Sequence, residues 1–177
     1  MRPLIFSLLL ASSIIAAELP RPASELAVKM PDGKQKLLSE YRGDVVCVAF
    51  ILTTCSHCQK AVQDLSAVEN ELGPKGFRVL AAAINDDANV PQFMQEFKPA
   101  FSVGVATREV AAQYMKFNPG ERAFMPFLLF IDRKGVIRAQ YTGADEAFFN
   151  DGAKNIREQA EKLLGNSTVA KGRRGTR

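Results

Sequence analysis

Two cysteines, Cys55 and Cys58, are separated by two residues in the segment Cys55-Ser56-His57-Cys58. Thiols at this spacing can form a disulfide within one helical turn, and such a pair can exchange electrons with other thiols and disulfides. A structural zinc site usually needs four ligands, and the chain adds only Cys47 and its single histidine, His57, to the pair. We therefore predict a redox pair without a metal. A purely structural disulfide and a copper(I) site built from two thiolates are the alternatives.

The pair lies where an apolar run ends and a helical pattern begins. Residues 45–52 are eight mostly β-branched or large apolar residues, which predicts a strand buried on both faces. From Cys58 onward, apolar residues recur at helical spacing as far as Gly73-Pro74, where the helix should end. Cys55 is therefore expected at the N-terminus of a helix, where unpaired N–H groups and the helix dipole favour a thiolate.

The start of the chain predicts a secretory signal peptide over residues 1–17. A positive charge at Arg2 precedes Leu4 to Ile15, twelve mostly apolar residues, and the small residues Ala16 and Ala17 follow. This run is shorter than the roughly 20 apolar residues of a membrane span, so we expect cleavage after Ala17. The protein should then be secreted across the inner membrane into the periplasm. An uncleaved N-terminal membrane anchor is the alternative.

The rest of the chain predicts one domain, residues 18–164, followed by a basic tail, residues 165–177. The whole chain has a net charge of +4, and the tail has four basic residues and no acidic ones. The domain itself is balanced in charge, so nothing indicates a nucleic-acid surface. The glycine-containing tail is predicted to be disordered. Cys47 lies about 25 Å from Cys55 along an extended strand, beyond disulfide reach, so we expect a buried core cysteine.

The order of the predicted elements indicates a mixed α/β domain. Strands at 25–30 and 34–38 flank Pro31-Asp32-Gly33, which is a hairpin turn signal, and a helical turn over 39–42 follows. Further strands are expected at 45–52, 77–84, 101–105, 127–131 and 136–141, and helices after Cys58 and at 90–97, 108–117 and 144–164, the last interrupted or kinked near Gly152. This alternation, ending in a hairpin and a helix, predicts a mixed central sheet with helices on both faces.

These motifs resemble the extracytoplasmic thioredoxin-like proteins of the TlpA/ResA type, in the AhpC/TSA-related superfamily. The resemblance covers about residues 22–164, and it rests on Pro31-Asp32-Gly33-Lys34, on residues 38–43, on the cysteine pair, on Met125-Pro126 and on residues 131–137. It implies a thioredoxin fold with an N-terminal β-hairpin. It also implies thiol–disulfide exchange with protein thiols and disulfides, in which Cys55 attacks and Cys58 resolves. No cofactor beyond the Cys55–Cys58 disulfide is implied, and a membrane redox partner would recycle the pair.

The resemblance also implies which residues surround the pair. Pro126 corresponds to a cis-proline that faces the cysteines across a groove. The exposed backbone of Met125 would pair with an extended substrate segment there. Thr54, Ser56 and His57 would complete the lining of the groove. Thr54 stands where the family usually has tryptophan, and the chain has no tryptophan at all.

Two further side chains are candidates for supporting roles. His57 is similar to the histidine of the DsbA oxidase motif, which stabilises the reactive thiolate and so makes the disulfide more oxidising. The domain as a whole resembles the reductases, so the direction of electron flow stays open. Asp87, with its neighbour Asp86, approximates the position of an acidic residue in ResA-type active sites. A solvated loop carboxylate is the simpler interpretation of this aspartate.

A peroxiredoxin-like thiol peroxidase is the alternative enzyme, because that fold shares the hairpin and the strand that leads to the active cysteine. Its usual signature is P-x-x-x-T-x-x-C, and this chain has Val48 and Leu52 in place of the proline and the threonine. A copper carrier of the Sco type is the alternative binding protein. That family separates its cysteines by three residues and uses a distant histidine, and this chain has neither feature.

Overall fold

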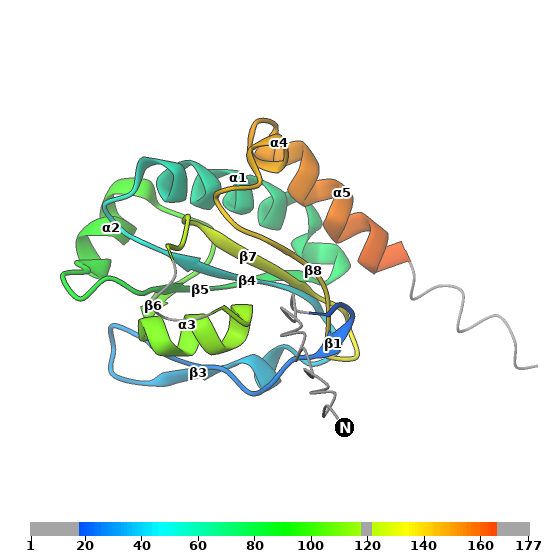
Figure 1. Cartoon of the computed structure of the whole chain (residues 1–177), viewed down its shortest axis with the longest axis horizontal. Helices are drawn as coiled ribbons and strands as arrows, with labels where there is room; N and C mark the ends of the chain where they lie inside the picture. Colours follow the sequence, from blue (N-terminus) through cyan, green and yellow to red (C-terminus); the bar gives the residue numbers. More distant parts are fainter. Residues whose placement is uncertain (1–17, 118–121, 166–177) are drawn as a thin grey trace, which may run out of the picture.

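The computed structural model describes residues 18–117 and 122–165. These residues form an eight-stranded mixed sheet in the order β1-β8-β7-β4-β5-β6-β2-β3, with helices on both faces (Figure 1). The predicted signal peptide and the tail beyond Gly165 lie outside the described residues. No helix in the described part of the chain is both long and apolar enough to cross a membrane.

The observed elements follow the predicted order. The strands are β1 (Arg21–Pro22), β2 (Ala27–Lys29), β3 (Gln35–Leu37), β4 (Val45–Ile51), β5 (Phe77–Ala83), β6 (Val103–Val105), β7 (Phe127–Ile131) and β8 (Val136–Tyr141). The helices are α1 (Ser56–Leu72), α2 (Val90–Phe97), α3 (Arg108–Met115), α4 (Glu146–Phe149) and α5 (Gly152–Gly165), with short 3-10 turns at Leu38–Tyr41 and Gly73–Lys75. The expected interruption near Gly152 is the break between α4 and α5. The prediction missed β1, because two residues carry no periodicity.

β4 is a central strand, and its side chains contribute to two cores. It pairs in parallel with β5 and antiparallel with β7, and all its residues are buried. Cys47 and the other odd-numbered residues of β4 face the core formed with α1, α2, α4 and α5. The even-numbered residues face the core formed with α3 and the N-terminal strand β2. A strand covered on both faces needs apolar residues at every position, which explains the continuous apolar run.

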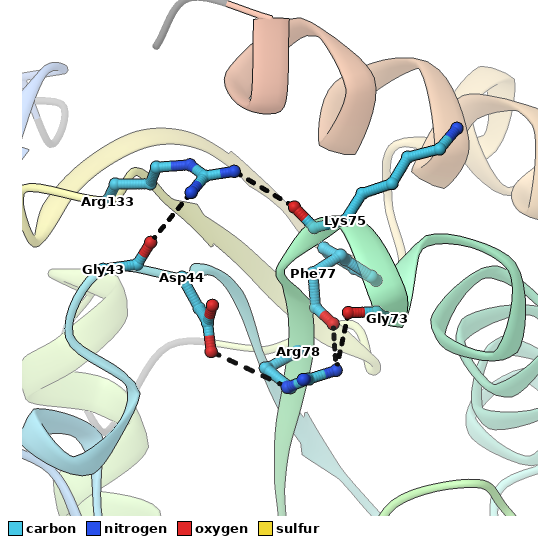
Figure 2. A network of polar contacts seen from close by, with 7 residues as sticks. All are labelled: Gly43, Asp44, Gly73, Lys75, Phe77, Arg78 and Arg133. Atoms are coloured by element: carbon cyan, nitrogen blue, oxygen red, sulfur yellow. Dashed lines mark hydrogen bonds and ion pairs between the residues drawn. The ribbon is translucent and has the colours of Figure 1, made fainter.

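Two arginines fix the end of the sheet at which β4 and β5 begin (Figure 2). Arg133, in the β7–β8 turn, donates to the carbonyl oxygens of Gly43 at 3.2 Å and Lys75 at 3.0 Å. Arg78, on β5, donates to the carbonyl oxygen of Gly73 at 3.0 Å. These bonds join three chain segments at one end of the sheet. The cysteine pair follows the opposite end of β4, so it extends from a strand that is anchored at its start.

Candidate active site

Cys55 occupies the N-cap position of α1. Its backbone is extended, with φ −91° and ψ 120°, and its carbonyl oxygen accepts the N–H of Gln59 at 3.0 Å. Its own N–H donates to the carbonyl oxygen of Leu52 at 3.2 Å, which closes the turn between β4 and α1. The predicted position at the helix N-terminus is therefore confirmed. The side chain is half-buried, beside first-turn N–H groups that favour a negative charge.

Cys58 lies in the first turn of the same helix, and it is fully buried. Burial raises the pKa of the Cys58 thiol well above its ordinary value, and the neighbouring Cys55 thiol raises it further. The N–H of Leu52 donates to Cys58 Sγ at 3.4 Å and acts in the opposite direction. Both cysteines are free thiols in the structure. The pair thus has an accessible outer sulfur and a buried inner sulfur, an asymmetry that suits a nucleophile and a resolving thiol.

The third cysteine, Cys47, is separate from this pair. It is completely buried in β4, and its Sγ contacts the carbonyl oxygen of Val48 at 3.9 Å. Burial raises the pKa of the Cys47 thiol far above its ordinary value. The predicted core cysteine is confirmed. Within residues 18–117 and 122–165, no group of three or more histidine, cysteine, aspartate or glutamate side chains is arranged to hold a metal ion.

The peptide bond between Met125 and Pro126 is cis, as the resemblance implied. β7 begins directly after this bond and pairs antiparallel with β4, with Phe127 opposite Phe50. Continuing the same register places Pro126 and Met125 beside the last residue of β4 and the segment that leads to Cys55. Pro126 is buried, whereas Met125 is half-buried and packs against the cores on both faces of the sheet.

Gly143, in the loop after β8, lies against this cis-proline segment. Its N–H donates to the carbonyl oxygen of Phe124 at 2.7 Å, and a Cβ at this position would lie 2.7 Å from the carbonyl carbon of Met125. The backbone N–H and C=O of Met125 make no hydrogen bond to any residue that the structure describes, and the C=O lies against Gly143. Sequence analysis missed Gly143, because its role is a tertiary contact that no motif marks.

Asn85 holds the loop between β4 and the cysteine pair. Its Oδ1 accepts the N–H of Thr53 at 3.0 Å, and its Nδ2 donates to Thr53 Oγ1 at 2.9 Å and to Asp87 Oδ1 at 2.8 Å. The side chain of Gln59, on α1, donates to the carbonyl oxygen of Thr53 at 3.0 Å. Every polar group of the buried Thr53 is therefore satisfied. Sequence analysis missed Thr53, Asn85 and Gln59, which carry no periodic signal.

The predicted supporting residues lie at the surface around Cys55. Thr54, Ser56 and His57 are exposed, and no hydrogen bond joins their side chains to the described residues. Asp87 is also exposed, and it connects to the site only through its hydrogen bond with Asn85. A hollow of about 430 Å³ lies beside Thr54, and Asp87 forms part of its wall. The chemical roles of these four residues stay predictions.

The chain is similar to several known proteins. A model of the AhpC/TSA family matches residues 20–140. A thiol:disulfide interchange protein of the thioredoxin family from Chlorobium tepidum TLS has a TM-score of 0.65 at 22% identity, covering 85% of this chain and 100% of that chain. The thioredoxin domain of a thiol-disulfide oxidoreductase from Bacteroides vulgatus has a TM-score of 0.64 at 18% identity, and the match covers 81% of this chain and 96% of that chain. A thiol:disulfide interchange protein from Bacteroides sp. has a TM-score of 0.64 at 16% identity, and the match covers 86% of this chain and 94% of that chain. At these identities the likeness establishes the fold, and the predicted thioredoxin-like fold is confirmed.

Proposed function

Because the chain belongs to the AhpC/TSA family, we propose that it is a thiol–disulfide oxidoreductase that acts on protein thiols and disulfides through Cys55 and Cys58. The asymmetry of the pair carries this proposal. Cys55 is half-buried at a helix N-terminus, whereas Cys58 is fully buried behind it. A cis-proline beside the same loop supports binding of an extended substrate segment, since the backbone of the preceding Met125 makes no hydrogen bond to the described residues.

In the reducing direction, the Cys55 thiolate attacks one sulfur of a substrate disulfide. That disulfide breaks, and the departing substrate thiolate takes up a proton from water. Cys58 then gives up its proton and attacks Cys55 Sγ in the mixed disulfide, and the second substrate sulfur leaves as a thiol. Two electrons have moved to the substrate, and the Cys55–Cys58 disulfide has formed. The same steps in reverse oxidise a substrate dithiol.

The surroundings of Cys58 fit its part in these steps. Burial keeps the pKa of the Cys58 thiol high, so that it stays protonated while Cys55 performs the first attack. The Leu52 N–H, 3.4 Å from Cys58 Sγ, would stabilise negative charge on this sulfur as its proton leaves. The backbone of Met125 would pair with the substrate on the other side of the disulfide. His57, Ser56 and Thr54 form the remaining surface that a substrate would meet.

We also place this activity outside the cytoplasm, because residues 1–17 have the pattern of a signal peptide. An oxidising compartment supplies protein disulfides as substrates. Each reducing turnover leaves the pair oxidised, so a dithiol donor must restore it, and we propose a membrane protein for this role. The mass of the exported protein tests the location, since cleavage after Ala17 removes residues 1–17, and a full-length exported chain would show an anchor instead.

The activity is tested with insulin reduction by dithiothreitol. Wild type should accelerate the reaction, Cys55→Ser should abolish the acceleration, and Cys47→Ala should retain it. Cys58→Ala should accumulate mixed disulfides on non-reducing gels, whereas Cys55→Ala should accumulate none. Rapid consumption of hydrogen peroxide without insulin reduction would replace this proposal with a thiol peroxidase.

The reduction potential of the Cys55–Cys58 couple decides the direction of electron flow between the protein and its substrates. A value well above that of thioredoxin, about −270 mV, would favour oxidation of substrates. A value at or below it would favour reduction fed by a membrane donor.

A further inference from the structure

Phe124 is the only large hydrophobic side chain that is exposed among the described residues, with 48% of its surface accessible. Single exposed apolar residues are common on proteins and need no special explanation. The position of this one is informative, however, because it lies two residues before Pro126, in the cis-proline segment beside the cysteine pair. The exposed ring therefore belongs to the segment that leads into β7, beside the end of β4 from which the chain continues to Cys55.

The structure holds this ring in place without burying it. The carbonyl oxygen of Phe124 accepts the N–H of Gly143 at 2.7 Å, which fixes the backbone. The guanidinium carbon of Arg122 lies 5.3 Å from the centre of the ring. The next residue, Met125, packs against both cores. Phe124 itself belongs to neither core and stays exposed beside the half-buried Met125.

A ring held in this way is well suited to binding. Aromatic side chains supply a large contact area at a low cost in conformational entropy, and they are enriched among the residues that dominate binding energy. An extended segment that pairs with the unbonded backbone of Met125 would place one of its side chains over Phe124, because its side chains alternate. The side chain that fits an exposed aromatic ring is apolar.

We propose that Phe124 anchors protein substrates by contacting an apolar side chain next to the substrate cysteine. This inference rests on the proposed function, and it adds a sequence preference to it. The side chain of Phe124 has no nucleophilic or ionisable group, so it should act through binding. It should therefore change the ratio of rates between apolar and polar substrates without changing the reduction potential.

The test compares two peptides that have one disulfide each and differ only beside the cysteines, where one has leucine and the other serine. Reduced wild type should react with the leucine peptide about tenfold faster than with the serine peptide. Phe124→Ala should bring this ratio close to one, and Phe124→Leu should keep most of it. Hydroxyethyl disulfide, which has no side chain to contact, provides the reference rate for each variant.

The outcomes separate this inference from the proposed function. If wild type reacts with none of the three disulfides, the proposed function fails. The proposed role of Phe124 as an anchor is wrong if wild type reacts with all three disulfides but shows no preference for the leucine peptide. It is also wrong if Phe124→Ala keeps the preference. A shift of the reduction potential in Phe124→Ala would also overturn it, since it would show an effect on the cysteines themselves. A concentration-dependent dimer that Phe124→Ala dissolves would assign the ring to self-association instead.

Discussion

Gly143 and Met125 are in backbone contact, and a Cβ on Gly143 would lie 2.7 Å from the carbonyl carbon of Met125. This contact joins the loop after β8 to the cis-proline segment beside the cysteine pair. The cis-proline side of the candidate site thus depends on a residue outside both the cysteine motif and the apolar pattern.

Replacing Gly143 by alanine should therefore disturb both the fold and the site. The added methyl group would meet backbone atoms, which cannot move aside as a side chain can, so we expect a loss of roughly 1 to 3 kcal/mol in the free energy of unfolding. The Met125-Pro126 segment must also shift, and the rate of insulin reduction should fall. Urea denaturation and the insulin assay measure the two effects. Gly165→Ala is the matched control, because a Cβ there meets nothing within 4 Å. Equal stability of the two variants would show that the loop adapts freely.

Replacing Asn85 by alanine should weaken the loop that precedes Cys55. The change leaves the N–H and hydroxyl of the buried Thr53 without partners, which should cost roughly 1 to 3 kcal/mol of unfolding free energy. Asp87→Asn is the control, since its remaining carbonyl oxygen can still accept from Asn85. We expect Asp87→Asn to keep the wild-type stability and insulin reduction rate. A large loss of rate in Asp87→Asn would instead show that its carboxylate takes part in proton transfer.

Glu69, on α1, should make the stability depend on pH. Burial raises the pKa of Glu69 to about 7 from its ordinary 4.5, against the opposing effects of the Val79 amide and the Arg78 guanidinium. One of its oxygens, Oε2, is buried without a partner among the described residues. Between pH 4.5 and 7 the native state thus holds more of this proton than the unfolded state does. The contribution of Glu69 to stability therefore falls as the pH rises through this window, and it is constant above it.

Glu69→Gln should remove this dependence, because the amide has no proton to lose. The variant should be more stable than wild type at pH 8 by roughly 1 to 3 kcal/mol, less than the full linkage value because the carboxyl is only partly buried. The advantage should shrink towards pH 4.5. Urea denaturation at several pH values measures it, with the exposed Glu161→Gln as a control that should follow wild type. A Glu69→Gln variant less stable than wild type at pH 8 would contradict this reasoning.

His57 is exposed in the first turn of α1, two residues after Cys55. If its protonated ring stabilises the Cys55 thiolate, His57→Ala should make the disulfide harder to reduce and lower its potential by up to about 30 mV, since that shift corresponds to about 1.4 kcal/mol. Equilibration with glutathione measures the potentials of wild type and His57→Ala. Identical potentials would show that His57 has no part in redox tuning.

Cys47 should be chemically silent in the folded protein. It is fully buried, and its raised pKa leaves little thiolate to react. Iodoacetamide should label Cys55 first in the reduced native protein and leave Cys47 unmodified, whereas all three cysteines should react in urea. All three cysteines lie in one tryptic peptide, residues 43–60, so fragmentation of this peptide by tandem mass spectrometry locates the label. Rapid labelling of Cys47 in the native state would indicate a second redox centre.

The sequence by itself determined the fold class and the position of the cysteine pair. The apolar run of β4 and the helical spacing of α1 are local, periodic patterns, and together they place Cys55 at the start of the helix and Cys58 within its first turn. The turn signals around Gly33 and Gly135 likewise act within a few residues, and both glycines have the positive φ that such turns require. Signals that act between residues close together in the chain can be recognised in a single sequence.

Only the tertiary structure decided what surrounds the pair. Asn85 reaches Thr53 across neighbouring strands, and Gly143 meets Met125 from a loop that is distant in the chain. These contacts involve single polar or small residues, which have no periodicity and look like ordinary loop residues in the sequence. The exposure of Phe124 was hidden for a different reason. An aromatic residue before an apolar strand reads as core, and only the packing of the segment around Pro126 turns its ring outward.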